Sequence, residues 1–142
     1  MPFLGFQTRT FPEGTHTVAD AAAAVGVAPG QIVKSLVLRR ASGTPLLVTA
    51  SGTNRVDLAK VAALAGEPVE MAPAKWVRQV TGFSIGGIPP AGHAEPIETL
   101  VDEDLLAYDE VWAAAGSPTE VFGLAPQELV TLTGGTLAAV AE

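Results

Sequence analysis

The sequence predicts a single domain of mixed α/β class, with strands and helices interspersed along the chain. Its 142 residues are the length of one domain and are enough to bury a sizeable core. Two pairs of strand-like segments, within 31–50 and 111–124, follow each other as closely as the arms of hairpins. Such neighbours favour a sheet with both parallel and antiparallel strands over a purely parallel one.

Capping residues and apolar spacing mark the helices of the first half. Thr17 can cap a helix whose apolar residues follow helical spacing, and Gly26 is a suitable stop. Asp57 and Gly66 bracket a second helix in the same way. The elements expected in this half are a short strand at 7–11, a helix at 18–25, strands at 31–38 and 46–50 joined by a polar turn, and a helix at 58–65.

Proline and glycine punctuate the second half. Pro73 and Pro126 suit the first turn of a helix, and Asp102 can cap a short helix that runs through Leu106. The elements expected here are a strand at 68–71, a helix from Pro73 to about 81–82, a strand starting at 83–85, a strand at 97–101, the short helix after Asp102, strands at 111–115 and 121–124, and a last helix from Pro126 that Gly134 and Gly135 stop.

One lysine lies in the middle of the strand expected at 31–38. Because side chains alternate along a strand, Lys34 shares a face with Ile32, Leu36 and Leu38. An ammonium group in such apolar surroundings is costly without a partner. Three outcomes are open: the pKa of Lys34 falls, its side chain extends to a sheet edge, or an anion binds opposite it. The third outcome would make a ligand site.

Composition excludes several classes of protein. An apolar content of 48% does not fit a disordered chain, and no apolar run approaches the roughly 18 residues of a membrane span. The absence of cysteine excludes disulfides, thiolate metal sites and a cysteine nucleophile. His16 and His93 show no metal-binding spacing, so we expect no metal. The start of the chain lacks a signal-peptide pattern, so we expect a cytoplasmic protein.

The charge balance argues against a general nucleic-acid binder. Eight basic and fifteen acidic residues give a formal net charge of −7. A chain of that charge repels a phosphate backbone at long range. We therefore expect no DNA partner, and any contact with nucleic acid must be local.

The stretch 86–93, Gly-Gly-Ile-Pro-Pro-Ala-Gly-His, is the longest segment rich in glycine and proline. Paired glycines permit positive φ and a close approach of the backbone, and paired prolines stiffen the chain beyond them. Such a loop either presents its amide N–H groups to a ligand or forms an ordinary rigid turn. Both interpretations are open from the residues alone.

Six segments, in this order, resemble the YbaK/ProX family. They are Thr17-Val18-Ala19-Asp20-Ala21-Ala22, Gln31-Ile32-Val33-Lys34-Ser35-Leu36, Arg55-Val56-Asp57, Thr81-Gly82, the loop 86–93, and Ala114-Ala115-Gly116. The likeness covers about residues 15–135 in unbroken order. The family comprises free-standing aminoacyl-tRNA deacylases and the editing domain inserted in bacterial prolyl-tRNA synthetases. Many members carry an additional N-terminal helix, whereas only sixteen residues precede Thr17 here.

The resemblance implies a curled mixed sheet with a pocket for the aminoacylated 3′ end of tRNA. By position, the near-invariant lysine of the family is Lys34, and its loop glycine is Gly86 or Gly87; these are the implied catalytic residues. The residues implied to bind substrate are Ser35, Ile88, Pro89, His93, Gly116 and Ser117. The resemblance implies no cofactor, and it makes prolyl-tRNA synthetase a candidate partner.

The activity implied is trans-editing, the hydrolysis of tRNA-Pro mischarged with alanine, cysteine or another small amino acid. An aminoacyl ester is already activated, so a site needs only to position it beside water or a ribose hydroxyl and to stabilise an oxyanion. Lys34 would supply a cation for the terminal phosphate or ribose, and the loop amides would meet the carbonyl oxygen. Two alternatives stay open: a module that binds an aminoacyl or nucleotide end without turnover, and an inert domain that pairs with a synthetase.

Overall fold

The computed structural model describes residues 6–11, 17–84, 87–93, 96–117 and 119–142. Its eight-stranded sheet has the order β1-β7-β6-β2-β3-β5-β8, and β4 pairs with β2 outside this path. The strands are β1 (Gln7–Thr10), β2 (Ile32–Arg40), β3 (Pro45–Ser51), β4 (Val69–Met71), β5 (Glu98–Asp102), β6 (Val111–Ala114), β7 (Glu120–Leu124) and β8 (Thr136–Ala138). The helices are α1 (Val18–Val25), α2 (Leu58–Ala65), α3 (Ala74–Thr81), α4 (Pro126–Thr133) and the 3-10 turns η1 (Pro29–Gln31) and η2 (Glu103–Ala107).

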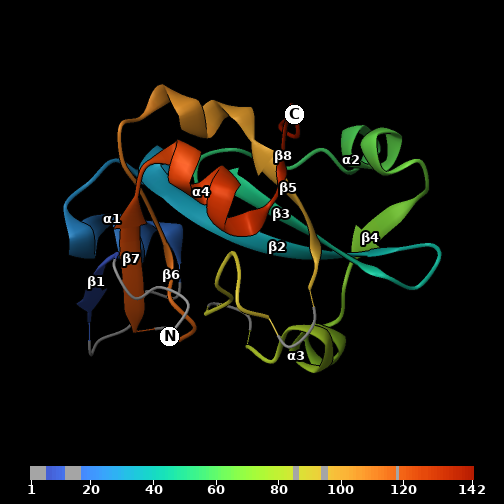
Figure 1. Ribbon diagram of the computed structural model, residues 1–142, viewed down its shortest axis with the longest axis horizontal. Coiled ribbons are helices and arrows are strands. Elements are labelled where there is room, and N and C mark those ends of the chain that lie inside the picture. The colour runs from blue at the N-terminus through green and yellow to red at the C-terminus, as the bar shows by residue number, and fades with distance from the viewer. Residues whose placement is uncertain (1–5, 12–16, 85–86, 94–95, 118) are drawn as a thin grey trace.

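The prediction of a mixed sheet is confirmed. Both hairpin-like pairs are antiparallel, β2 with β3 and β6 with β7. The pairs β2–β6, β3–β5 and β5–β8 are parallel. Strands β1, β7 and β6 run across the direction of β2 and β3 (Figure 1), so the sheet is curled as the resemblance implied.

Local capping explains why the helix boundaries follow the sequence closely. Thr17 Oγ1 accepts the Asp20 N–H at 3.0 Å, and Asp57 Oδ1 accepts the N–H groups of Ala59 and Lys60 at 2.9 and 3.2 Å. These bonds satisfy donors that the first turn of a helix leaves free. The helices predicted at 18–25 and 58–65 are therefore confirmed at both ends. No helix in the described ranges has both the length and the apolar character needed to cross a bilayer.

One expectation needs correction. The segment predicted to start a strand at 83–85 is not a strand where it is described, because the Phe83 N–H bonds to Thr81 Oγ1 at 3.0 Å and Ser84 closes a turn. The short helix predicted after Asp102 is confirmed as the 3-10 helix η2, which Asp102 caps. Strand β8, which follows the glycine stop, was not expected; its three residues are too few to show a period in the sequence.

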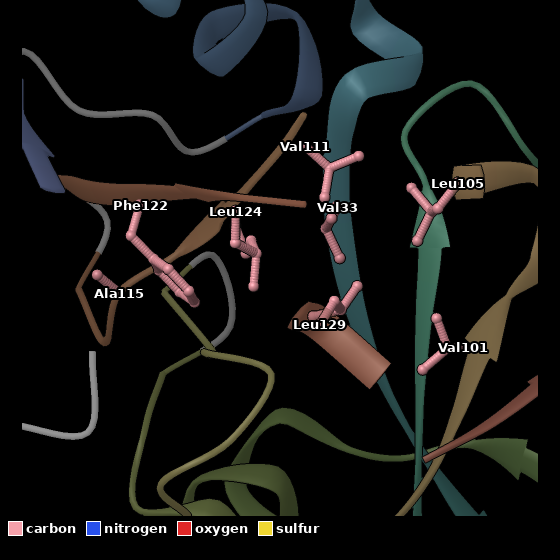
Figure 2. Packing of buried hydrophobic residues seen from close by; sticks show 9 residues of the cluster. Val33, Val101, Leu105, Val111, Ala115, Phe122, Leu124 and Leu129 are labelled. Atoms are coloured by element: carbon pink, nitrogen blue, oxygen red, sulfur yellow. The ribbon is translucent and has the colours of Figure 1, made fainter. Parts of the chain in front are cut away.

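Apolar clusters cover both faces of the sheet. On one face, Leu129 of α4 lies between Val33 of β2 and Val101 of β5, as Figure 2 shows. On the other face, Ile32 packs with α1, and Leu38 packs with Val61 of α2. Helix α3 and the loop that follows it lie below the sheet in Figure 1. Because side chains alternate along β2, consecutive residues of this strand point to opposite faces of the sheet, one packed against α4 and the other against α1 and α2.

Candidate active site

Lys34 lies on β2 directly beside Ala50 of β3, on the face it shares with Ile32 and Leu38. The residue is half-buried. Burial lowers the pKa of Lys34 from its usual value, and the negative charge of Asp102 opposes that effect. Among the described residues, Lys34 Nζ has neither an ion-pair partner nor a hydrogen-bond acceptor. The ammonium group is therefore partly desolvated and unpaired, which is the arrangement that favours an anionic ligand.

The strand beside Lys34 has an open edge. Strand β2 pairs with β6 only through Ile32 and Val33, and with β4 only from Leu38 onward. Residues 34–37 have no partner strand on that edge among the described strands; the Ala72 N–H reaches the Val37 carbonyl at 3.4 Å. We call residues 34–37 the open edge of β2. Backbone polar groups without a partner strand need another partner, such as a loop, water or a ligand.

The hydroxyl of Ser35 lies at this open edge. Its Oγ atom is buried and has no hydrogen-bond partner among the described residues. Buried polar atoms without a partner are uncommon in folded proteins, so this hydroxyl is a candidate for contact with a ligand. Ser35 points to the face opposite Lys34, because the two residues are neighbours on one strand.

The glycine-proline loop packs on the Ser35 face. Ile88 is 5% exposed and belongs to a cluster with Val37, Leu47 and Val77. The Gly87 N–H donates to the Ser84 carbonyl at 3.0 Å, so in this conformation it is already bonded. Gly86 lies outside the described residues. The loop is thus anchored by an apolar side chain beside the open edge of β2.

Pro89 and His93 form a polar contact within the loop. The His93 Nε2 atom lies 2.7 Å from the Pro89 carbonyl oxygen. A carbonyl can only accept, so Nε2 carries the proton and donates. Burial lowers the pKa of His93, with a smaller opposing effect from this hydrogen bond. The neutral ring keeps a lone pair on Nδ1. A hollow of about 270 Å³ beside it is lined by Pro90, Ala91, Gly92, His93, Pro96, Ile97, Thr99 and Thr133.

Phe83 connects this loop with the end of β6. A Cβ atom added at Gly116, whose φ is +108°, would lie 3.2 Å from Phe83 Cε1. The Phe83 and His93 rings meet edge to face with centroids 6.3 Å apart. Ser117 follows Gly116, and its hydroxyl lies 3.1 Å from the hydroxyl of Thr119. The ring of Phe83 was not singled out in the sequence because its segment was expected to be a strand.

A buried carboxylate, Asp102, was predicted only as a helix cap. It does accept the Asp104 N–H at 3.0 Å through Oδ1. Its Oδ2 accepts the Ser51 N–H at 3.0 Å and the Asn54 Nδ2 group at 2.7 Å. The residue is 1% exposed. The pairing of β3 with β5 brings Asp102 close to Lys34, and no local pattern in the sequence could have shown this.

The structure thus gathers the predicted residues in two groups on either side of β2. Ser35, the described loop residues and Gly116 lie toward the face that carries Phe83, whereas Lys34 lies on the face of α1 and α2. The open edge of β2 is where the two groups adjoin. In the described part of the chain, no three His, Cys, Asp or Glu side chains are grouped so that they could hold a metal ion.

Comparison with known proteins gives consistent results. A family model described as "Aminoacyl-tRNA editing domain" matches residues 12–132. EbsC of Enterococcus faecalis, a candidate Cys-tRNA(Pro)/Cys-tRNA(Cys) deacylase, is 30% identical over 127 residues, which are 88% of this chain and 77% of EbsC. The proline–tRNA ligase of Bacillus licheniformis is 33% identical over 102 residues, 71% of this chain but 17% of the ligase.

A solved structure matches almost the whole chain. The crystal structure of a candidate trans-editing enzyme for prolyl-tRNA synthetase has a TM-score of 0.93 and 46% sequence identity to this chain. The match covers 99% of this chain and 88% of the solved one. At this identity the likeness extends beyond the architecture to the residues that build it.

Proposed function

The chain belongs to the aminoacyl-tRNA editing domain family, and on that premise we propose that it removes small mischarged amino acids, alanine or cysteine among them, from tRNA-Pro. Membership makes it a hydrolase of the aminoacyl-tRNA deacylase class, and it confirms the YbaK/ProX resemblance. The choice of tRNA-Pro is supported by the names of EbsC and of the solved trans-editing enzyme. The match to a part of a proline–tRNA ligase, 17% of its length, also supports this choice.

The observation that carries the proposal is the state of Lys34. A half-buried ammonium group without an ion pair in the described chain is costly unless a ligand supplies the missing charge. The 3′ end of tRNA offers a phosphate next to the ester that has to be cleaved. Lys34 would bind that phosphate or the neighbouring ribose and so hold the ester in place.

Hydrolysis at this site needs positioning more than a strong nucleophile. The oxygen of a water molecule forms a bond with the ester carbonyl carbon, the bond to the ribose oxygen breaks, and the ribose oxygen takes up a proton. Amide groups of Gly86 and Gly87 are proposed to stabilise the negative charge that develops on the carbonyl oxygen. The Gly87 N–H must first leave the Ser84 carbonyl, so substrate binding would have to open that turn.

The remaining predicted residues are proposed to shape the amino-acid pocket. The unpartnered Ser35 hydroxyl could accept from or donate to the amino acid. Ile88 and Pro89 supply an apolar, buried wall, and Gly116 allows a close approach beside Phe83. His93 and Ser117 would add polar contacts at the margin. Prolyl-tRNA synthetase is a proposed partner that would deliver the tRNA.

A deacylation screen tests the proposal. The protein is incubated with tRNA-Pro charged with alanine, cysteine, serine, threonine or proline, and release of the amino acid is compared with the uncatalysed rate. We expect release of alanine or cysteine and little release of proline. Release of none of the five would overturn the proposed substrate and favour a module that binds without turnover.

Two substitutions test the role of Lys34. Lys34→Ala and Lys34→Met should abolish deacylation while the protein remains folded, because removing the ammonium also removes its desolvation cost. Lys60→Met is the matched control, since Lys60 Nζ instead donates to the Ala141 carbonyl at 2.7 Å. Near-normal turnover by either Lys34 variant would show that its side chain serves only the fold.

A further inference from the structure

Asp102 and Lys34 lie on one row across the sheet. Lys34 is paired with Ala50 of β3. Val101 is paired with Thr49, so the next residue, Asp102, flanks Ala50 from the other side. All three side chains point to the face of α1 and α2, since Ala50 belongs to the cluster there. Strand β3 lies between the strands of Lys34 and Asp102, and the residue of β3 in this row is Ala50, which is fully buried.

The carboxylate of Asp102 carries a charge that its hydrogen bonds do not neutralise. Its three donors, the Ser51 N–H, the Asn54 side-chain amide and the Asp104 N–H, are all neutral groups. They occupy both oxygens and fix the carboxylate in place. The ion pairs within the described residues are Arg39–Glu70, Arg40–Glu98 and Arg55–Glu142, so Lys34 and Asp102 do not form a direct pair.

Other charged groups on this side of the molecule have partners elsewhere or lie at the surface. Asp57 caps α2, Lys60 binds the Ala141 carbonyl, Arg55 pairs with Glu142, Asp104 accepts from Asn54, and Asp20 and Glu103 are exposed. Among the described residues, the charge that acts against the effect of burial on the pKa of Lys34 is that of Asp102. The two groups are therefore coupled across Ala50 without touching.

We propose that Asp102 is a positioning residue that keeps the Lys34 ammonium charged while leaving it free to bind the substrate. A carboxylate in direct contact would also keep the lysine charged, but it would compete with the phosphate or ribose for the same donors. Because the oxygens of Asp102 are held by three N–H groups, they cannot move to Lys34 without breaking those bonds. The inference rests on the proposed function of Lys34 and adds to it a reason why the lysine is charged and unpaired at once.

The test compares Asp102→Asn with Asp104→Asn. Each substitution removes one negative charge at the start of η2, at positions two residues apart, but only Asp102→Asn removes the charge beside Ala50. The chain has three lysines, Lys34, Lys60 and Lys75, so carbon-13 labelling at lysine Cε gives three signals that Lys34→Met assigns. The titration of each signal is followed by NMR, and kcat/KM for deacylation is measured over the same pH range.

In Asp102→Asn we expect the pKa of Lys34 to fall below that of the wild type, and the alkaline limb of kcat/KM to move to lower pH by the same amount. On that limb, activity falls about tenfold per pH unit, so the variant loses most at high pH. Lys60 and Lys75 should titrate unchanged, and Asp104→Asn should match the wild type. A folded Asp102→Asn protein in which Lys34 titrates as in the wild type would overturn the proposal.

The variant Asn54→Ala distinguishes an effect of the Asp102 charge on Lys34 from an effect of the hydrogen bonds that hold Asp102. This variant removes the bonds of Asn54 to Asp102 and Asp104 but keeps both charges, so Lys34 should titrate as in the wild type. Asp102→Ser, which retains a capping oxygen for η2, serves if Asp102→Asn does not fold. If neither variant folds, Asp102 serves the fold itself and the proposal is overturned. The NMR result stands whether or not the wild type deacylates tRNA, so failure of the proposed function is seen separately.

Discussion

Replacing Gly116 by alanine should damage the active site more than the fold. Gly116 has φ of +108°, a conformation that costs a residue with a side chain about 1–2 kcal/mol. The new methyl group would also lie 3.2 Å from Phe83 Cε1. Moving the Phe83 ring off its rotamer adds about 0.5–1.5 kcal/mol. We therefore expect the free energy of unfolding to fall by about 1.5–3.5 kcal/mol.

Gly43→Ala is the matched control for this substitution. Gly43 has φ of +89°, but an added Cβ would meet no heavy atom within 4 Å. Its free energy of unfolding should fall only by the backbone cost of about 1–2 kcal/mol. Chemical denaturation gives both values, and deacylation is measured at a temperature where both variants are fully folded. Gly116→Ala should then lose most of its kcat/KM, because Phe83 also contacts His93 in the loop, whereas Gly43→Ala should retain it.

Two results would refute this reasoning. Equal losses of stability in the two variants would show that the Phe83 contact costs nothing. Normal deacylation by folded Gly116→Ala would show that the end of β6 and the position of the Phe83 ring are unimportant for the reaction.

Two further predictions concern pH and salt. Folding lowers the pKa of His93 below its usual 6.5, so the neutral ring stabilises the fold fully above that pH, and this stabilisation declines as the pH falls from 6.5 to the pKa of the folded state. Between pH 7.5 and 5, the Tm of His93→Gln should therefore fall less than the Tm of the wild type. Parallel curves of Tm against pH would contradict this. For uncharged tRNA-Pro, a plot of log affinity against log salt concentration should have a slope of roughly −1.5 to −3, because the cations without a described partner are Lys34, Lys75 and Arg78. A slope steeper than about −5 would reveal an extended basic surface.

Elements with local signals were predictable from the sequence. Thr17 and Asp57 hold the first turns of α1 and α2 through bonds to residues two or three positions away, so the sequence contains the whole cause. The alternation of β2 likewise placed Lys34 on the face of Ile32 and Leu38. Strand β8 could not be predicted in this way, because it forms through parallel pairing with Leu100, Val101 and Asp102 of β5, which are distant in the sequence.

Only half of the lysine site was accessible from the sequence. The position of Lys34 in a strand is a local property, but its coupling to Asp102 depends on the registers of β2 with β3 and of β3 with β5. Parallel pairing between distant segments leaves no mark in either segment. Ser35 was found only through the family resemblance; its buried, unpartnered hydroxyl is a property of the folded chain.

The open edge of β2 explains how one strand could serve a substrate with two chemically different ends. Neighbouring residues of a strand point to opposite faces, so Lys34 and Ser35 would be separated by the sheet if another strand continued along residues 34–37. Because β6 leaves after Val33 and β4 joins at Leu38, no described strand covers the edge beside Lys34 and Ser35, but the buried Ser35 hydroxyl would have to become exposed before a ligand could reach both side chains. On the proposed function, the phosphate or ribose would lie toward Lys34 and the amino acid toward Ser35 and Ile88. The ester joining them would then cross the edge itself, where the free backbone of β2 and the loop could hold it.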